Sequence, residues 1–388
     1  MMRLRFLASL LFAGLLLAQR APVESAWDLL AKGQRKQAIA ALHEILKANA
    51  GDADARLLLG SILSEDGEHS EAIEQLSQAV RLRPSSAEAR NALGEALNGF
   101  GDTKTAREAF EKAVALDPAL AQARVNLGQL MVQAGEFAAA AKHLDRALLI
   151  LGTTPDAAFP LYLRAKVDTE QQKTQAALSH LSRAVALQPD FAEAWSDLGR
   201  TRKTLSDDAG ALAAFKRAVE AGPGDAVAQY RLGSEYLHQG EAHLAVVHLQ
   251  RALELNPDDQ STLYSLQIAL RQDGQLEQAR KTKERLTELL RTRDQVARNA
   301  LTAVQLNNQG AELEKAGNLR GALEKYHAAL QLSPEHVGFR LNFAAGLLRT
   351  GQWSQGIAEL REAVRRDPGN NAARSALDDA LAQRAAKP

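Results

Sequence analysis

A pattern of small and apolar residues returns with a period of about 34 residues along most of this chain. Its clearest copy occupies residues 192–223. Gly199 lies in the first half of that copy, Ala211 and Phe215 lie in the second half, and Pro223 comes at the end. One copy of this length is too small to bury its apolar surface alone, so several copies must stack to be stable. The period therefore predicts an elongated stack of repeats and argues against a single globular core.

Each copy has the pattern of two short amphipathic helices joined by a turn. Two packed helices need small residues where their backbones approach, so we expect Gly199 of the first helix to face Ala211 of the second. Phe215 is expected to fill the space between this pair of helices and the next. Asp207 precedes the second helix and can cap its free N–H groups, and Pro223 prevents that helix from continuing.

Alignment on the glycine, alanine and proline positions gives ten repeats. They start at residues 19, 53, 87, 121, 158, 192, 226, 260, 303 and 337. Most starts are separated by one full period, but three extra residues precede residue 158 and nine extra residues precede residue 303. The repeats use the chain up to residue 370, which leaves no room for a separate catalytic domain.

The pattern W-x2-L-G, A-x3-F and P, formed here by Trp195, Leu198, Gly199, Ala211, Phe215 and Pro223, resembles the tetratricopeptide repeat (TPR). The resemblance implies an all-α, right-handed superhelix, or α-solenoid, of about ten helix-turn-helix repeats. It also implies that the first helices line a concave groove, which in this family commonly binds extended peptides or partner helices.

We expect the chain to divide into four segments. They are a signal peptide at residues 1–18, repeats 1–8 with an extended last helix at residues 19–292, repeats 9 and 10 at residues 293–370, and a capping helix and tail at residues 371–388. Gly310 is the one glycine between residues 276 and 316, and no proline lies there. We expect the second helix of repeat 8 to end near residues 291–293 and a new helix to begin near Asp294.

The segment 1–18 has the pattern of an export signal. Arg3 and Arg5 precede an apolar run from Phe6 to Ala18, which is too short to span a bilayer comfortably. Cleavage after Ala18 is expected, and an uncleaved N-terminal anchor is the alternative. The chain contains no cysteine, which excludes disulfides and thiolate metal sites. We expect an exported protein of the bacterial periplasm or a secreted protein.

The resemblance places the groove on the first helices, and three of the five tyrosines of the chain occupy the fifth position of a repeat. The predicted groove residues are Tyr162, Lys166, Asp197, Arg200, Lys203, Tyr230, Arg231, Tyr264 and Arg271, with Glu193 as a further counter-charge. Aromatic and guanidinium groups together offer apolar contact and hydrogen-bond donors to a peptide with acidic and apolar side chains. Alternatively, the tyrosines pack against the next helix and the cations only solvate a helix face.

Asn126, Asn308 and Asn342 occupy the sixth position of their repeats. Some members of the family use an asparagine there to bind the backbone of a peptide, so these three residues are included in the predicted groove. They belong to three of ten repeats, which argues against backbone capture along the whole groove. The set of lysines and asparagines with which some relatives clamp chaperone tails is absent from consecutive repeats.

No catalytic signature is present. His238, His243 and His248 are five residues apart, so neighbours do not share a helix face, and we expect surface imidazoles and no metal site. The sequence contains no zinc-protease, nucleophile-elbow or phosphate-loop motif. Because 47 basic residues balance 47 acidic ones, nucleic-acid binding is disfavoured.

These observations predict a non-catalytic scaffold or adaptor of the cell envelope that binds a protein or peptide without a cofactor, along the groove or on the convex face of the second helices. No nucleic-acid partner is expected, and membrane contact is expected only through an uncleaved signal anchor. One alternative is an accessory subunit of a polysaccharide synthesis, export or glycosyltransferase system. Another is an enzyme whose site is hidden among the repeats.

Overall fold

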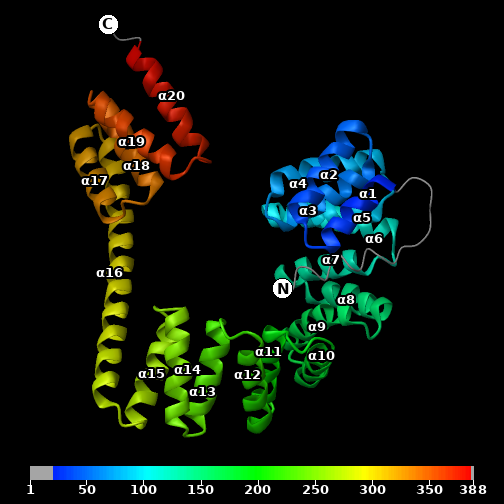
Figure 1. The fold of residues 1–388 in the computed structure, drawn as a ribbon. Coiled ribbons are helices and arrows are strands. Elements are labelled where there is room, and N and C mark those ends of the chain that lie inside the picture. Colours follow the sequence, from blue (N-terminus) through cyan, green and yellow to red (C-terminus); the bar gives the residue numbers. More distant parts are fainter. Residues whose placement is uncertain (1–20, 386–388) are drawn as a thin grey trace. The chain divides into compact units, whose positions relative to one another are not determined.

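The computed structural model describes residues 21–385, and it shows α-helices connected by short turns (Figure 1). Within that range there are twenty α-helices, one short 3₁₀ helix and no strand. The predicted signal peptide lies outside the described residues. No helix inside the described range combines the length and the apolar character needed to cross a membrane.

The first compact unit ends at Leu255 and contains repeats 1–7. Its helices are α1 (Ala21–Ala31), α2 (Arg35–Ala48), α3 (Ala53–Glu65), α4 (His69–Leu82), α5 (Ala87–Phe100), α6 (Thr103–Leu116), α7 (Ala121–Gln133), α8 (Phe137–Leu151), η3 (Pro155–Ala157), α9 (Ala158–Glu170), α10 (Thr174–Leu187), α11 (Ala192–Thr204), α12 (Asp208–Ala221), α13 (Ala226–His238) and α14 (Ala242–Leu255). Each repeat contributes two consecutive helices.

The second compact unit begins at Asn256 and contains repeats 8–10. Its helices are α15 (Gln260–Gln272), α16 (Leu276–Lys315), α17 (Leu319–Leu332), α18 (Val337–Arg349), α19 (Trp353–Arg366) and α20 (Asn371–Ala385). The helix starts at residues 53, 87, 121, 158, 192, 226, 260 and 337 coincide with the predicted repeat starts. The all-α architecture of paired helices is therefore confirmed.

Local sequence explains where most helices begin and turn. The side chain of Asp207 caps α12 by accepting a hydrogen bond of 2.9 Å from the backbone N–H of Gly210, as predicted. The turn between the two helices of a repeat requires a left-handed backbone residue, which is usually glycine, as at Gly101 with φ of 97°. Repeat 6 uses Ser206 there, with φ of 60°.

The two helices of a repeat approach most closely at the glycine of the first helix. A Cβ atom added to Gly199 would lie 2.4 Å from Cε1 of Phe215, so the aromatic ring lies directly over this glycine. Phe110 covers Gly94 in the same way. The missing side chain of the glycine thus creates room for the Phe215 ring inside its own pair of helices. That the ring also fills the space between neighbouring repeats stays a prediction.

The predicted break near residues 291–293 is wrong. α16 is a single helix of 40 residues that serves as the second helix of repeat 8 and the first helix of repeat 9. Without proline and with Gly310 as its one glycine, this segment has no strong helix breaker near residues 291–293, so the nine extra residues extend the helix. At 1.5 Å per residue its length is about 60 Å. The predicted segment boundary at 292/293 falls inside this helix.

The C-terminal helix forms as predicted. α20 begins at Asn371, and the side chain of Asn370 accepts a hydrogen bond of 3.0 Å from the backbone N–H of Ala373. Ala373 and Ala380 are buried, and Ala380 belongs to the apolar cluster that also contains Leu360 of α19. The helix therefore covers the last apolar face of the stack.

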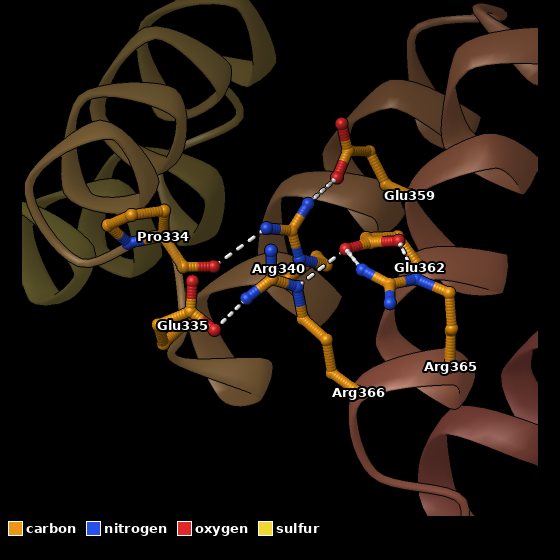
Figure 2. A network of polar contacts seen from close by, with 7 residues as sticks. All are labelled: Pro334, Glu335, Arg340, Glu359, Glu362, Arg365 and Arg366. Atoms are coloured by element: carbon orange, nitrogen blue, oxygen red, sulfur yellow. Dashed lines mark hydrogen bonds and ion pairs between the residues drawn. The ribbon is translucent and has the colours of Figure 1, made fainter.

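A polar network fixes repeat 10 to the turn before it (Figure 2). The Arg340 guanidinium on α18 is 8% exposed, donates a hydrogen bond of 2.7 Å to the carbonyl oxygen of Pro334, and pairs with Glu359 on α19. Arg366 pairs with Glu335 and with Glu362. Hydrogen bonds from Arg365 and Arg366 lower the pKa of the Glu362 carboxyl to about 2, so it stays ionised within this network.

Candidate functional site

The first helices of the repeats form the inner side of the first compact unit. α3 contacts α5, α5 contacts α7, α7 contacts α9, and α11 contacts α13, although α9 and α11 do not contact each other to the same extent. No two second helices of neighbouring repeats in the described range make a comparable contact. In a curved stack the elements that approach one another lie on the inside of the curve. Exposed side chains on these first helices therefore face a concave surface.

Tyr162 on α9 forms part of an aromatic wall. Its ring centroid lies 4.9 Å from that of Phe191, which precedes α11, and 6.4 Å from that of Phe159. The Lys166 ammonium lies 5.5 Å from the centroid of the tyrosine ring. Burial, together with the charge of Asp197, raises the pKa of Tyr162 to about 12. The tyrosine is half-buried and neutral, so it offers a ring edge and a hydroxyl rather than a charge.

Asp197 on α11 is shared by two arginines. Arg231 on α13 donates a hydrogen bond of 2.5 Å to the Ser196 hydroxyl and lies 3.3 Å from the Asp197 carboxylate. Arg200 lies 3.4 Å from the same carboxylate, and its side chain is 53% exposed. Arg231 is thus largely held by its own chain, while Arg200 keeps much of its guanidinium in solvent.

The charge of Lys203 is compensated within the protein. Its ammonium lies 2.8 Å from Asp208, 3.0 Å from the buried Glu235 and 3.3 Å from Nδ1 of His238. Burial lowers the pKa of Lys203, but hydrogen bonds to the two carboxylates outweigh burial and raise the pKa above its ordinary value. Lys203 therefore joins α11 to α13 and has little capacity left for a ligand.

Of the cations predicted for the groove, Lys166 and Arg200 are the two in this compact unit that remain available to a ligand. Both are exposed, and both line a hollow of about 40 Å³ between α9 and α11, together with Thr169 and Glu170. No carboxylate pairs with Lys166 among the residues that the structure describes. The hollow has room for a small group such as a carboxylate.

The remaining predicted residues are distributed over both compact units. Tyr230 is half-buried on α13 of the first unit. Tyr264 is 57% exposed on α15 of the second unit, and Arg271 is exposed on the same helix. Asn308 is exposed on α16. A single groove through all of these residues stays a prediction.

Two of the three predicted asparagines connect neighbouring first helices. Asn126 on α7 donates hydrogen bonds to the Asn91 amide oxygen, at 3.0 Å, and to the Glu95 carboxylate, at 2.7 Å, both on α5. Asn342 on α18 donates to the Asn307 amide oxygen on α16 at 2.8 Å. These amides orient adjacent repeats, which is a structural role that does not require a bound peptide.

Glu95 was not among the predicted residues. It accepts hydrogen bonds from both Asn91 and Asn126, and its side chain is exposed on the concave surface. Partial desolvation by the surrounding protein and repulsion by Glu65 raise the pKa of Glu95, although the two amide hydrogen bonds act against this. Glu95 occupies the ninth position of its repeat, as Lys166 and Arg200 do, and comparison along that position would have found it.

A second polar group that sequence reasoning missed lies at the junction of repeats 4 and 5. Asp168 on α9 is fully buried, accepts from Arg164, and lies 2.8 Å from Nδ1 of His180 on α10. Arg164 also lies 2.8 Å from Asp145 on α8. Both oxygens of the Asp168 carboxylate are therefore satisfied by side chains of the protein, and the cluster stabilises charge inside the stack.

The histidines His238, His243 and His248 do not form a metal site. Among residues 23–385, no group of three or more histidine and carboxylate side chains is arranged to hold a metal ion. The expectation that all three lie at the surface is wrong for His248, whose Nδ1 lies 2.9 Å from the Gln229 amide oxygen and whose ring stacks on Tyr236 at 5.6 Å. Burial lowers the pKa of His248, so this imidazole is neutral.

Comparisons with known proteins agree with the repeat pattern. Models described as tetratricopeptide repeat match residues 23–87, 63–121 and 162–226, residues 97–166 and 313–383, and residues 226–259. The TPR repeat-containing thioredoxin TTL4 of Arabidopsis thaliana is 36% identical over 87 residues. That match covers 21% of this chain and 13% of the relative, so the chain spans a small part of that protein.

Two solved structures are similar to parts of the chain. PilF of Pseudomonas aeruginosa has a TM-score of 0.51 and 19% identity, and the match covers 54% of this chain and 94% of PilF. YrrB, a TPR protein with an unusual peptide-binding site, has a TM-score of 0.41 and 24% identity, with 49% of this chain and 96% of YrrB covered. The similarity to PilF shows the fold alone. The chain therefore belongs to the tetratricopeptide repeat family, whose repeats form scaffolds for protein–protein interaction.

Proposed function

We propose that the chain is a non-catalytic adaptor that holds an extended peptide or a partner helix on the concave surface of repeats 3–7. The observation that carries this proposal is the pair of available cations, Lys166 and Arg200, beside the half-buried aromatic wall of Tyr162 and Phe191. Such a surface combines apolar area with charged hydrogen-bond donors, which is the composition of residues that dominate binding energy at interfaces.

The proposal separates binding residues from residues that hold the stack together. Lys203 and Arg231 contact carboxylates of their own chain, and Asn126 contacts the preceding repeat. Replacing them would disturb the packing of the first helices as well as the binding of a ligand. Lys166 and Arg200 contact the rest of the protein less, so replacing them tests binding more cleanly.

The test is a pull-down with the variant Lys166→Ala/Arg200→Ala. The matched control is Lys142→Ala/Arg146→Ala, which removes one exposed lysine and one exposed arginine from α8, a second helix. We expect the first variant to lose partners that the wild type and the control retain, with helical content and thermal unfolding unchanged in all three. Equal recovery of the same partners by both variants would contradict binding on the concave surface.

We also propose that the protein works in the cell envelope, as an exported periplasmic or secreted protein. Support comes from the sequence, in which Arg3 and Arg5 precede an apolar run that ends at Ala18. Fractionation of cells that express a C-terminally tagged chain, followed by N-terminal sequencing, tests this. Recovery of the chain in the cytosol with Met1 or Met2 at its N-terminus would contradict export.

A further inference from the structure

The ninth position of four consecutive repeats forms a row of changing charge. Glu95, Gln129, Lys166 and Arg200 occupy this position on α5, α7, α9 and α11. The repeat places them at equivalent points of the first helices, and the contacts agree. Glu95 accepts a hydrogen bond from α7, while Lys166 and Arg200 line one hollow between α9 and α11. The row is therefore negative at one end and positive at the other.

The negative end of the row is not paired with a cation of the described residues. In the described part of the chain, no lysine, arginine or histidine side chain forms an ion pair with Glu95, and its hydrogen bonds come from Asn91 and Asn126. The carboxylate of Glu65, whose charge acts on Glu95, differs in this respect because it pairs with Arg35. The amides orient the Glu95 carboxylate without cancelling its charge.

The cations at the positive end of the row are incompletely paired. Among the described residues, Lys166 pairs with no carboxylate, and Arg200 shares Asp197 with Arg231. Glu170 at the edge of the same hollow offsets part of this charge. Lys166, Arg200 and Arg231 therefore share this region with Asp197, Glu170 and Glu193, whose charge acts on Tyr162, and Lys166 and Arg200 are the exposed cations of the set.

We propose that the concave surface selects a ligand segment with separated charges, in which a basic side chain binds at Glu95 and an acidic group binds at Lys166 and Arg200. This inference rests on the proposed function and defines its ligand. Neighbouring packed helices lie about 8–10 Å apart, so two repeats correspond to about 20 Å. An extended chain rises about 3.3 Å per residue, which places the basic and acidic groups about six residues apart.

The separation of charge gives the ligand a direction. A segment bound in the opposite direction would place like charges together at both ends of the row, and such contacts discriminate between binding modes more than they add affinity. Exposed charge pairs contribute about two- to fivefold each in affinity. Because exposed charges are screened over about 10 Å at 0.1 M salt, the preference is expected to weaken as salt increases.

The test uses a displayed library of random dodecapeptides, selected in parallel on the full chain and on the variants Glu95→Lys and Glu74→Lys. Glu74 is exposed on α4, a second helix, and serves as the matched control. We expect peptides selected on the wild type and on Glu74→Lys to carry lysine or arginine about six residues from aspartate or glutamate. Selection on Glu95→Lys is expected to lose the basic residue.

Affinity measurements on one selected peptide complete the test. By fluorescence anisotropy at low salt, Glu95→Gln is expected to weaken binding about two- to fivefold. Replacing the basic residue of the peptide with alanine should remove that difference between the two proteins, as in a double-mutant cycle. Circular dichroism of both Glu95 variants checks that they are folded.

The outcomes separate this inference from the proposed function. Selected peptides without separated charges, or peptides that bind Glu95→Lys equally well, would overturn charge selection. If the same peptides still depend on Lys166 and Arg200, binding on the concave surface would stand. If no peptide is enriched, or if enriched peptides bind Lys166→Ala/Arg200→Ala as well as wild type, both proposals fail for linear peptides.

Discussion

At the residue scale, the cluster around Asp168 replaces contacts that are apolar elsewhere in the stack. Arg164 and Asp168 stand at the positions that Leu127 and Met131 occupy in the preceding repeat, where both side chains are buried. Burying charges is costly unless they are paired, and here Arg164 and His180 pair with the carboxylate. The stability of this junction therefore depends more on every buried charge having a partner than on the strength of any one ion pair.

We predict that Asp168→Ala lowers the free energy of unfolding of this region by about 3–5 kcal/mol, because it removes the buried partner of Arg164 and His180 and leaves Arg164 with the exposed Asp145 alone. The matched variant Arg164→Leu/Asp168→Met gives repeat 5 the apolar residues of repeat 4, which also has a histidine, His143, at the position of His180. This variant is expected to be as stable as the wild type or more stable. Urea denaturation followed by circular dichroism measures both. A loss below about 1 kcal/mol for Asp168→Ala would show that the cluster tolerates the loss of its buried carboxylate.

Whether a predicted groove residue is available to bind a ligand depends on the neighbours of that one side chain. Lys166 and Lys203 both project from first helices, yet Lys203 lies between Asp208 and Glu235 while Lys166 lies over an aromatic ring. Position in the repeat predicts that both face the concave surface. Whether either is free depends on which carboxylates the neighbouring repeat supplies, and the repeat pattern does not contain that information.

At the scale of the element, α16 differs from every other helix of the chain that the structure describes. In repeat 6 the third and seventh positions, Ala194 and Leu198, are buried, whereas in repeat 9 the same positions are Gln305 and Gln309 and both are exposed. With Asn308, they line an open hollow of about 670 Å³. These amides occupy positions that are apolar in repeat 6, and α16 presents them to solvent. The solvent-exposed face of α16 is therefore encoded in the residue types as well as in the length of the helix.

We predict uneven hydrogen exchange along α16. The side chains of residues 291–298 are exposed, so the amides there are protected only by the helix itself, while Ala303 and Gly310 are buried against the adjacent helix. Amides in the middle of the helix are expected to exchange at least about tenfold faster than those of residues 306–313. Exchange followed by mass spectrometry measures both segments in one experiment. Uniform protection along α16 would mean that another surface covers its middle.

At the scale of the whole molecule, repeats contact mainly their neighbours, so stability is local. The first compact unit ends at Leu255 and the second begins at Asn256, and each has its own buried apolar clusters. A change that destabilises one unit is therefore expected to leave the local protection of the other nearly unchanged.

We predict that Asp168→Ala reduces hydrogen-exchange protection in α8–α10 while α17–α19 remain as in the wild type. Gly310→Ala is the reciprocal control, because its new Cβ would lie 2.7 Å from the Tyr326 ring and disturb α16 and α17. It should reduce protection in the second unit alone. Equal loss of protection in both units for either variant would instead indicate one cooperative transition.

The sequence by itself determined the local architecture, because the interactions that specify it recur within each repeat. Helix starts, the cap formed by Asp207, and the glycine that admits Phe215 all depend on residues of one repeat. The same local information placed Tyr162, Lys166 and Arg200 on first helices. It was insufficient for α16, where we expected a turn that no residue of the segment requires.

Only the tertiary structure decided which of those side chains are available to a ligand. Asn126 reaches Asn91 and Glu95, and Arg231 reaches Ser196, from one repeat to the adjacent one. Such contacts depend on how closely neighbouring first helices approach, which follows from the packing of whole repeats and not from residue spacing. For that reason the repeat pattern identified the concave surface, while the structure showed that Glu95, Lys166 and Arg200 keep charge there that the protein does not fully compensate.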